Sequence, residues 1–247
     1  MMFIIAGKEL RLLFASPLAW VVLAFLQLVF SWIFLSRVDY FLTVQAQLAR
    51  IPNAPGLTEI AVVPVFGVAS IVLLMTVPLL TMRLIAEERR NQTMALLMSA
   101  PVSMTEIVLG KYLAMLSFLA IVGLLIVFMA VSLLSGGTLD AGLIAANLIG
   151  IMLLAASFAA IGLFVSCLTN HPVVAAVLTL AVFLGLWMVN IATSDPQSAL
   201  HYVSLLKHFE RFMNGSVALS DLIYFTLLIA AFLILSIRRL DADRLSA

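Results

Sequence analysis

The stretch AGLIAANLIGIMLLAASFAAIGLFVSC, residues 141–167, contains no charged residue and is long enough to cross a bilayer as a helix. Inside a membrane its backbone N–H and C=O groups find no water, so they must be satisfied within a helix or a closed barrel. Barrel strands alternate apolar and polar residues over about ten positions, and this stretch does not alternate. It therefore predicts a membrane-spanning helix.

The rest of the chain has the same character. Hydrophobic residues make up 64% of the sequence and charged residues 10%, whereas about a quarter of the residues in a soluble domain are charged. Runs of about 20 apolar residues occur at approximately residues 18–36, 60–82, 112–134, 141–167, 173–193 and 221–237. The sequence therefore predicts an all-α integral membrane protein with six transmembrane helices in one domain, residues 1–247.

Two further segments are amphipathic. Residues 1–16 place apolar side chains at helical spacing, with charged side chains elsewhere on the helix, as in a helix that lies in the membrane interface. The alternative is a simple extension of the first span. Residues 202–213 predict an outer helix packed into the mouth of the bundle, and Asn214–Gly215 is typical of a helix end. Between the first two spans, the proline-rich turn signal within residues 37–59 predicts a loop.

The distribution of basic residues predicts the topology. Positively charged connections stay in the cytoplasm. One set of connections carries only Arg37, Arg50, Lys207 and Arg211. The other set carries Lys8, Arg11, Arg83, Arg89, Arg90, Lys111, Arg238, Arg239 and Arg244. Both termini are therefore predicted to be cytoplasmic.

The connection between the second and third spans, residues 83–101, is a dense block of charges followed by apolar residues. On a helix, Glu87 stands four residues after Arg83 and three before Arg90, which is the spacing of ion pairs across one turn. Pro101 then stops the helix, and residues 103–106 form a capping box that starts the next one. An ordinary solvated loop is the alternative interpretation.

This connection, continued through Gly110–Lys111, resembles the permease subunits of type-2 (ABC-2 type) ABC exporters. In that family a charged block after the second span is followed by a leucine-rich run, a proline and a helix ending in Gly-Lys. Length, six spans, an N-terminal interfacial helix and the outer helix fit as well, so the resemblance covers the whole chain. Within the family, the chain looks most like the short permeases associated with gliding motility and with nitrous oxide reductase maturation.

The resemblance implies a permease subunit of an ATP-driven exporter in the bacterial inner membrane. A separate ATP-binding subunit would bind the coupling segment, residues 83–101, through Arg83, Glu87, Glu88, Arg89, Thr93, Leu96, Leu97 and Pro101. A second permease copy, or a related permease, would complete the pathway, and a companion membrane protein with a large outer domain is a further expected partner. Thr76, Trp187 and Asn190 are the implied pathway residues. Hydrogen bonding between helices is the alternative for polar residues inside spans.

No stretch matches the phosphate-binding pattern G-x-x-x-x-G-K-[ST]. ATP and Mg²⁺ are therefore expected on the partner subunit, with no cofactor in this chain and no enzymatic activity of its own. No metal site is expected, because His201 and His208 stand nearly two helical turns apart and Cys167 is the single cysteine. A nucleic-acid partner is not expected either.

Two other functions stay open. An ion-coupled secondary transporter normally keeps ionisable residues inside its spans, and none is evident here. A non-transporting anchor that recruits a cytoplasmic partner is also compatible with the sequence. The residues identify no substrate, and they distinguish neither transport from mechanical work nor a homodimer from a heteromer.

Overall fold

The structure, a computed structural model, describes residues 1–48, 50, 52, 54–94, 102–135, 138–192 and 204–246. Every regular element within these ranges is helical, and six helices are long and apolar enough to cross a membrane. The prediction of an all-α protein with six spans is therefore confirmed.

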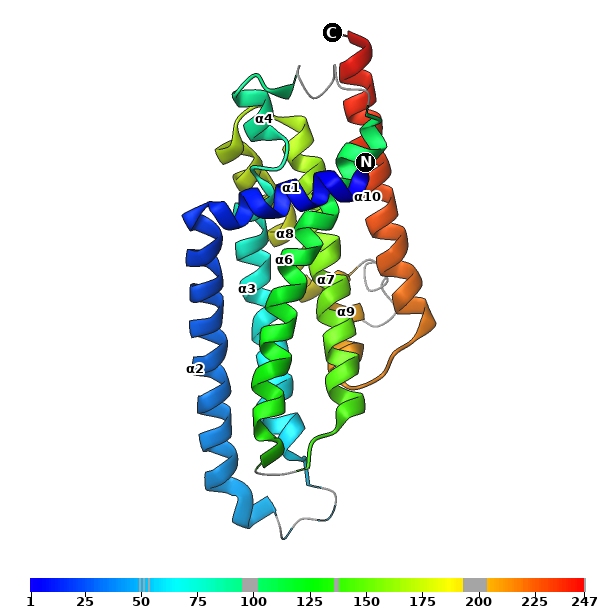
Figure 1. Ribbon diagram of the computed structural model, residues 1–247. Helices are drawn as coiled ribbons and strands as arrows, with labels where there is room; N and C mark the ends of the chain where they lie inside the picture. Colours follow the sequence, from blue (N-terminus) through cyan, green and yellow to red (C-terminus); the bar gives the residue numbers. More distant parts are fainter. Residues whose placement is uncertain are drawn as a thin grey trace.

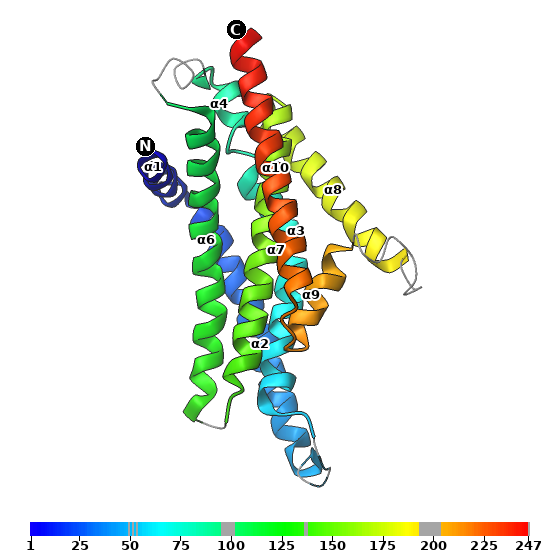
Figure 2. The same cartoon turned by 90° about the vertical axis from the view of Figure 1, so that its right-hand side faces the viewer.

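The spanning helices form one elongated bundle (Figure 1). They are α2 (Pro17–Leu48), α3 (Val63–Thr81), α6 (Met104–Ser132), α7 (Ala141–Leu168), α8 (Pro172–Ala192) and α10 (Leu219–Ser246). A π-helical turn, η1 (Thr58–Val62), leads into α3, and a 3-10 turn, η2 (Leu133–Ser135), follows α6. The α8 helix leans away from the bundle axis (Figure 2).

The α7 helix is the central element, because α3, α6, α8 and α10 all pack against it. Its small residues allow this close approach, as is typical of helix packing in membranes. At Gly162 a Cβ atom would lie 2.3 Å from Thr81 Oγ1 of α3, and at Gly150 it would lie 2.5 Å from Phe212 Cβ. Both glycines are therefore required by the packing of α7 against its neighbours.

The helix predicted over residues 1–16 is present as α1 (Met2–Ala15). It runs across the other helices, close to the N-terminal part of α6 (Figures 1 and 2). Ser16 has an extended backbone, because the residue before Pro17 disfavours helical geometry. Gly110 lets α1 lie against α6, since a Cβ there would be 2.8 Å from Ile5 Cβ.

The predicted loop over residues 37–59 is wrong in its first half, because α2 continues to Leu48. Residues 37–48 contain neither proline nor glycine, and nothing else in them stops the helix. At 1.5 Å per residue, α2 is about 48 Å long, so its end extends beyond an apolar layer of about 30 Å. The α6 and α10 helices are likewise longer than their apolar runs, since α6 begins at Met104 and α10 ends at Ser246.

The predicted amphipathic helix is confirmed as α9 (Leu205–Met213), with residues 202 and 203 outside the described residues, and its outer location stays a prediction. Its apolar face, with Phe209 and Phe212 buried, packs on α7. Gly215, at φ 77°, ends the segment in the left-handed conformation that glycine adopts without strain.

Hydrogen bonding between helices is the alternative expected for polar residues inside the spans, and four of their hydroxyl groups do not show it. The hydroxyl groups of Ser70, Thr76, Ser157 and Thr179 donate to carbonyl oxygens of their own helices, three or four residues earlier. A hydroxyl on a helix reaches such a carbonyl without any partner helix. The amide of Gln27, in contrast, also contacts Met129 Sδ of α6 at 3.5 Å. Hydrogen bonding between helices is therefore not the role of these four hydroxyl groups.

Candidate functional site

The charged connection between α3 and α6 lies at the end of the bundle where the N-terminus and the end of α10 also lie (Figure 1). Its described part contains a short helix, α4 (Ala86–Arg90), preceded by a turn that holds Arg83. The predicted capping box is confirmed, because Ser103 Oγ accepts a hydrogen bond from Glu106 N at 3.2 Å and Glu106 Oε2 accepts one from Ser103 N. The connection therefore ends in the fresh helix that the sequence predicts.

A serine of α7 holds the start of α4. Ser166 Oγ accepts hydrogen bonds from the backbone N–H groups of Ile85 at 3.1 Å and Ala86 at 3.0 Å. The same hydroxyl group donates to Met82 O at 3.3 Å. Because the first N–H groups of a helix have no partner within it, this buried hydroxyl group fixes α4 to the centre of the bundle.

A buried lysine joins α4 to two other helices. Lys111 Nζ of α6 lies 2.7 Å from Glu88 Oε1 of α4 and 3.0 Å from Glu9 Oε1 of α1. The Lys111 side chain is only 2% exposed. An ammonium group in such a place needs charged partners, because burial of an unpaired charge is strongly unfavourable. The Lys111 cluster, defined as Glu9, Glu88 and Lys111, therefore holds α1, α4 and α6 together.

The neighbouring arginine of α4 reaches a different helix. Arg89 forms an ion pair with Asp243, near the end of α10. Asp243 also lies 3.5 Å from Arg239, one turn earlier on α10. Consecutive residues of α4 thus bind different helices, with Glu88 paired to Lys111 of α6, which also binds α1, and Arg89 paired to α10. A displacement of α4 would pull on all three helices.

The remaining side chains of this connection are more exposed. Arg83 Nε and Glu87 Oε2 lie 4.0 Å apart, so this predicted pair is confirmed, and both side chains are nearly half exposed. The predicted pair of Glu87 with Arg90 is not formed. Arg90 and residues 91–93 are exposed, which leaves this face open to a partner.

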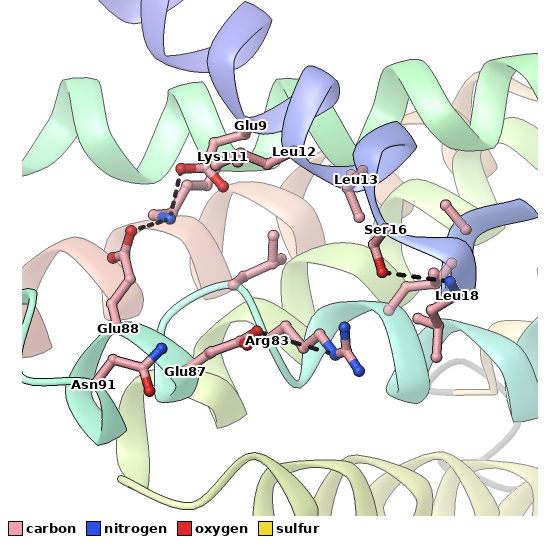
Figure 3. A pocket seen from close by; sticks show the side chains of 13 residues that line it. Glu9, Leu12, Leu13, Ser16, Leu18, Arg83, Glu87, Glu88, Asn91 and Lys111 are labelled. Atoms are coloured by element: carbon pink, nitrogen blue, oxygen red, sulfur yellow. Dashed lines mark hydrogen bonds and ion pairs between the residues drawn. The ribbon is translucent and has the colours of Figure 1, made fainter.

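A cavity of about 370 Å³ lies beside α4, between α1, the start of α2 and the end of α3 (Figure 3). Its lining includes the whole Lys111 cluster together with Arg83 and Glu87. Ser16 and Leu18 lie at the other end, away from Glu88 (Figure 3). The Lys111 cluster thus lies at one end of the cavity and Leu18 at the other, with the Arg83 side chain extending from the middle towards Ser16 (Figure 3).

The structure brings together five of the predicted contact residues, namely Arg83, Glu87, Glu88, Arg89 and Thr93. Two of them, Glu88 and Arg89, bind side chains of other helices, and Arg83 and Glu87 pair with each other. Leu96, Leu97 and Pro101 lie outside the described residues. Contact of any of them with an ATP-binding subunit stays a prediction.

The predicted pathway residues are not gathered at one site. Thr76 is buried within α3, where its hydroxyl group donates to Val72 O at 2.8 Å. Trp187 of α8 is partly exposed and lines, with Phe158 and Leu205, a cavity of only about 10 Å³. The side chain of Asn190 lies outside the described residues. A pathway through these residues stays a prediction.

Four residues of this arrangement were not found from the sequence: Glu9, Lys111, Ser166 and Asp243. Lys111 offers the one usable signal, because a lysine near the start of a long apolar run needs an acidic partner when it is buried. Ser166 and Asp243 lie 80 and 154 residues from their partners in α4, so no local pattern connects them.

A second cluster of charges lies beside α9. Asp221 of α10 is fully buried, with His208 Nδ1 at 2.5 Å and Arg211 Nη1 at 3.2 Å from its Oδ1 atom. The ring of His208 stacks on Tyr224, with centroids 4.1 Å apart. We name Asp221, His208 and Arg211 the Asp221 cluster. Within the part of the chain that the structure describes, no three His, Cys, Asp or Glu side chains form a group suited to a metal ion.

The chain is similar to one known protein family over almost its full length. The family described as "ABC-2 family transporter protein" matches residues 3–245. The chain therefore belongs to this family of membrane proteins. A search of curated proteins found no match.

Proposed function

Because the chain belongs to the ABC-2 family of transporter proteins, we propose that it is the permease subunit of an ATP-driven ABC exporter. A separate subunit would bind and hydrolyse ATP with Mg²⁺, and this chain would convert the motion of that subunit into movement of its spans. One observation carries the proposal: α4 protrudes at one end of the bundle, is tied by ion pairs to α6 and α10, and is connected to α1 through Lys111.

The end that carries α4 is proposed to face the cytoplasm, with both termini on that side and the chain in the bacterial inner membrane. The described basic residues that support this orientation are concentrated there, including Arg83, Arg90, Lys111 and Arg238. Such a bias towards one side is the usual determinant of membrane topology.

The proposed docking surface for the ATP-binding subunit is the exposed part of the coupling segment. It begins with Arg90 and residues 91–93 and would continue through Leu96, Leu97 and Pro101. Glu88 and Arg89 would transmit force rather than touch the ATP-binding subunit, because their side chains bind α6 and α10. This division makes two kinds of variant distinguishable.

The complex would contain two permease copies, or this chain and a related permease, around one pathway. A companion membrane protein with a large outer domain, as in the short permeases of gliding motility and nitrous oxide reductase maturation, is the proposed further partner. The long outer end of α2 supports an outer contact, since Tyr40 and Leu42 are exposed there.

The test uses the full-length chain purified in mild detergent together with its ATPase. Two quantities are measured: the ATPase recovered with the chain, and ATP hydrolysis after reconstitution into liposomes. Arg90→Glu reverses a charge on the proposed docking surface and should lower recovery about tenfold. Arg89→Gln should leave recovery unchanged but lower the hydrolysis that depends on the permease.

Arg238→Glu is the matched control, because Arg238 is an exposed arginine at the same end of the bundle but lies on α10. Normal recovery for Arg90→Glu and for a second variant, Thr93→Trp, would remove the proposed docking surface. If no ATPase co-purifies and an ion gradient alone drives transport, the chain is a secondary transporter. ATPase recovery without any permease-dependent hydrolysis would instead indicate an anchor.

A further inference from the structure

The cavity beside α4 has two chemically different ends (Figure 3). At one end lie the carboxylates and the ammonium group of the Lys111 cluster, with Asn91 close by. At the other end lie apolar side chains where α1 meets α2, among them Leu18 and Ala19. A cavity of about 370 Å³ falls in the size range of small-molecule sites. Its occupant should therefore be amphipathic.

The position of the cavity indicates a membrane lipid. Trp20, the residue after Ala19 in the cavity wall, is 60% exposed, and its Nε1 atom donates to Phe14 O at 2.9 Å. Exposed tryptophans gather at the level of lipid headgroups. The apolar end of the cavity adjoins the start of α2, which carries further exposed apolar side chains such as Val21 and Phe25. Acyl chains could thus leave the cavity along α2.

The charges of the lining specify the headgroup. Glu9, Glu87 and Glu88 contribute three carboxylates, against the two cations Arg83 and Lys111. The Lys111 ammonium group is already held by Glu9 and Glu88. Within the described part of the chain, the buried Glu88 Oε2 atom accepts no hydrogen bond. That atom has almost no accessible surface, whereas the Glu87 side chain is 45% exposed and is therefore the carboxylate that an N–H donor can reach.

Arg83 supplies the complementary group. Its guanidinium group meets Glu87 only at 4.0 Å through Nε, and its side chain is 40% exposed. A guanidinium group binds phosphate through two parallel hydrogen bonds, which is a geometry that favours arginine at phosphate sites. Arg83 lies along the same cavity as Glu87 and Glu88, on the side opposite α1 (Figure 3).

We propose that this cavity binds a phospholipid with a primary-amine headgroup, of the phosphatidylethanolamine type. The ammonium group donates to the carboxylate of Glu87, Arg83 binds the phosphate, and the acyl chains follow Leu18 onto the surface of α2. A choline headgroup has no N–H to donate. A glycerol headgroup adds negative charge without an ammonium group, where the lining already has an excess of carboxylates. The order of binding is therefore ethanolamine first, with choline and glycerol headgroups well behind.

Native mass spectrometry of the delipidated full-length chain, in detergent and without any ATPase, tests the proposal. Equal amounts of phosphatidylethanolamine, phosphatidylcholine and phosphatidylglycerol are offered, and bound lipid is counted for each. Arg83→Gln and Glu87→Gln each remove one charged contact and should weaken retention of phosphatidylethanolamine about tenfold. Both side chains are half exposed, so neither variant threatens the fold.

Arg11→Gln is the matched control, because Arg11 is an exposed arginine of α1 that does not line the cavity. It should bind lipid like the unaltered chain. Equal binding of the three lipids, or unchanged binding by Arg83→Gln and Glu87→Gln, overturns the proposal. Displacement of bound lipid by an added ATPase would assign the cavity to a protein partner and also overturn it. The measurement needs no ATP hydrolysis, so its failure leaves the proposed exporter function untouched.

Discussion

Two clusters of buried polar side chains lie at different levels of the bundle, the Lys111 cluster at the end that carries α4 and the Asp221 cluster beside α9, nearer the middle (Figure 1). The two clusters connect different kinds of elements. In the Lys111 cluster, Glu9 and Glu88 lie 102 and 23 residues from Lys111, and Arg89 binds an aspartate 154 residues away. In the Asp221 cluster, His208 and Arg211 lie 13 and 10 residues from Asp221. The first set of ion pairs joins helices that lie far apart in the sequence, whereas the second joins two consecutive helices, α9 and α10.

This difference suggests two roles for the clusters: transmission of motion between helices by the first, and local stabilisation by the second. The ion pairs around α4 connect this short protruding helix to α6 and α10 and, through Lys111, to α1. A change in these ion pairs should therefore alter how the helices move together. Ion pairs around Asp221 hold α9 against the start of α10. Changes in that cluster should lower stability but leave the link between ATPase and permease intact.

The largest expected effect comes from Lys111→Met, which leaves the carboxylates of Glu9 and Glu88 without their shared cation. Breaking a buried ion pair in this way costs about 3 kcal/mol or more. We expect a matching loss in the free energy of unfolding, measured by denaturant titration in mixed micelles. We also expect loss of permease-dependent ATP hydrolysis.

A triple variant, Lys111→Met with Glu9→Gln and Glu88→Gln, sharpens this prediction. Removing all the charges avoids unpaired carboxylates, so much of the lost stability should return. ATP hydrolysis should stay low, because the connection between α4 and α6 is still missing. If hydrolysis recovers together with stability, the Lys111 cluster has only a structural role.

Two glycines of α7 allow the same comparison through packing. Gly162→Ala places a methyl group against Thr81 of α3, just before α4, and Gly150→Ala places one against Phe212 of α9. Overpacking of this kind costs about 1–3 kcal/mol at each site. Thermal unfolding should therefore show similar losses, but only Gly162→Ala should reduce permease-dependent ATP hydrolysis. Equal losses of hydrolysis in both variants would contradict the proposal that the contacts around α4 transmit motion whereas those around α9 only stabilise the fold.

A smaller effect is expected from Ser166→Ala, which removes the hydroxyl group that accepts from Ile85 N and Ala86 N. Leaving these buried N–H groups without an acceptor costs about 1–2 kcal/mol. Ser157→Ala is the matched control on the same helix, because its hydroxyl group donates only to Leu153 O. Hydrogen exchange at residues 85 and 86 should accelerate in Ser166→Ala alone. Unchanged exchange there would show that other contacts hold α4 in place.

The sequence predicts the fold well because membrane burial leaves a strong signal. Apolar runs located the six spans, and the amphipathic patterns located α1 and α9. Helix ends outside the apolar layer were predicted less well, since α2 continues to Leu48 through residues with no special hydropathy. Where a helix continues beyond the membrane through polar residues, hydropathy does not mark its end. Only a proline or a capping residue does.

The site was predicted in part for a related reason. The charge block that became α4 and the capping box at Ser103 are local patterns, so the sequence alone reveals them. The partners of Glu88 and Arg89 come from α6, α1 and α10, and their pairing depends on how the bundle packs. The Gly110–Lys111 motif is visible in the sequence, but its structural role is not. That role depends on α1 lying against Gly110 and on Glu9 of α1 binding Lys111.

The smallest effect is expected from Asp221→Asn, in the cluster beside α9. Asparagine keeps the shape and one hydrogen-bond acceptor, while Arg211 is nearly half exposed and can be solvated without the carboxylate. The loss in the free energy of unfolding should therefore be about 1 kcal/mol, measured as for Lys111→Met. Permease-dependent ATP hydrolysis should equal that of the unaltered chain. If Asp221→Asn abolishes hydrolysis as Lys111→Met does, α9 also takes part in transmitting motion, and the Asp221 cluster and the Lys111 cluster are coupled.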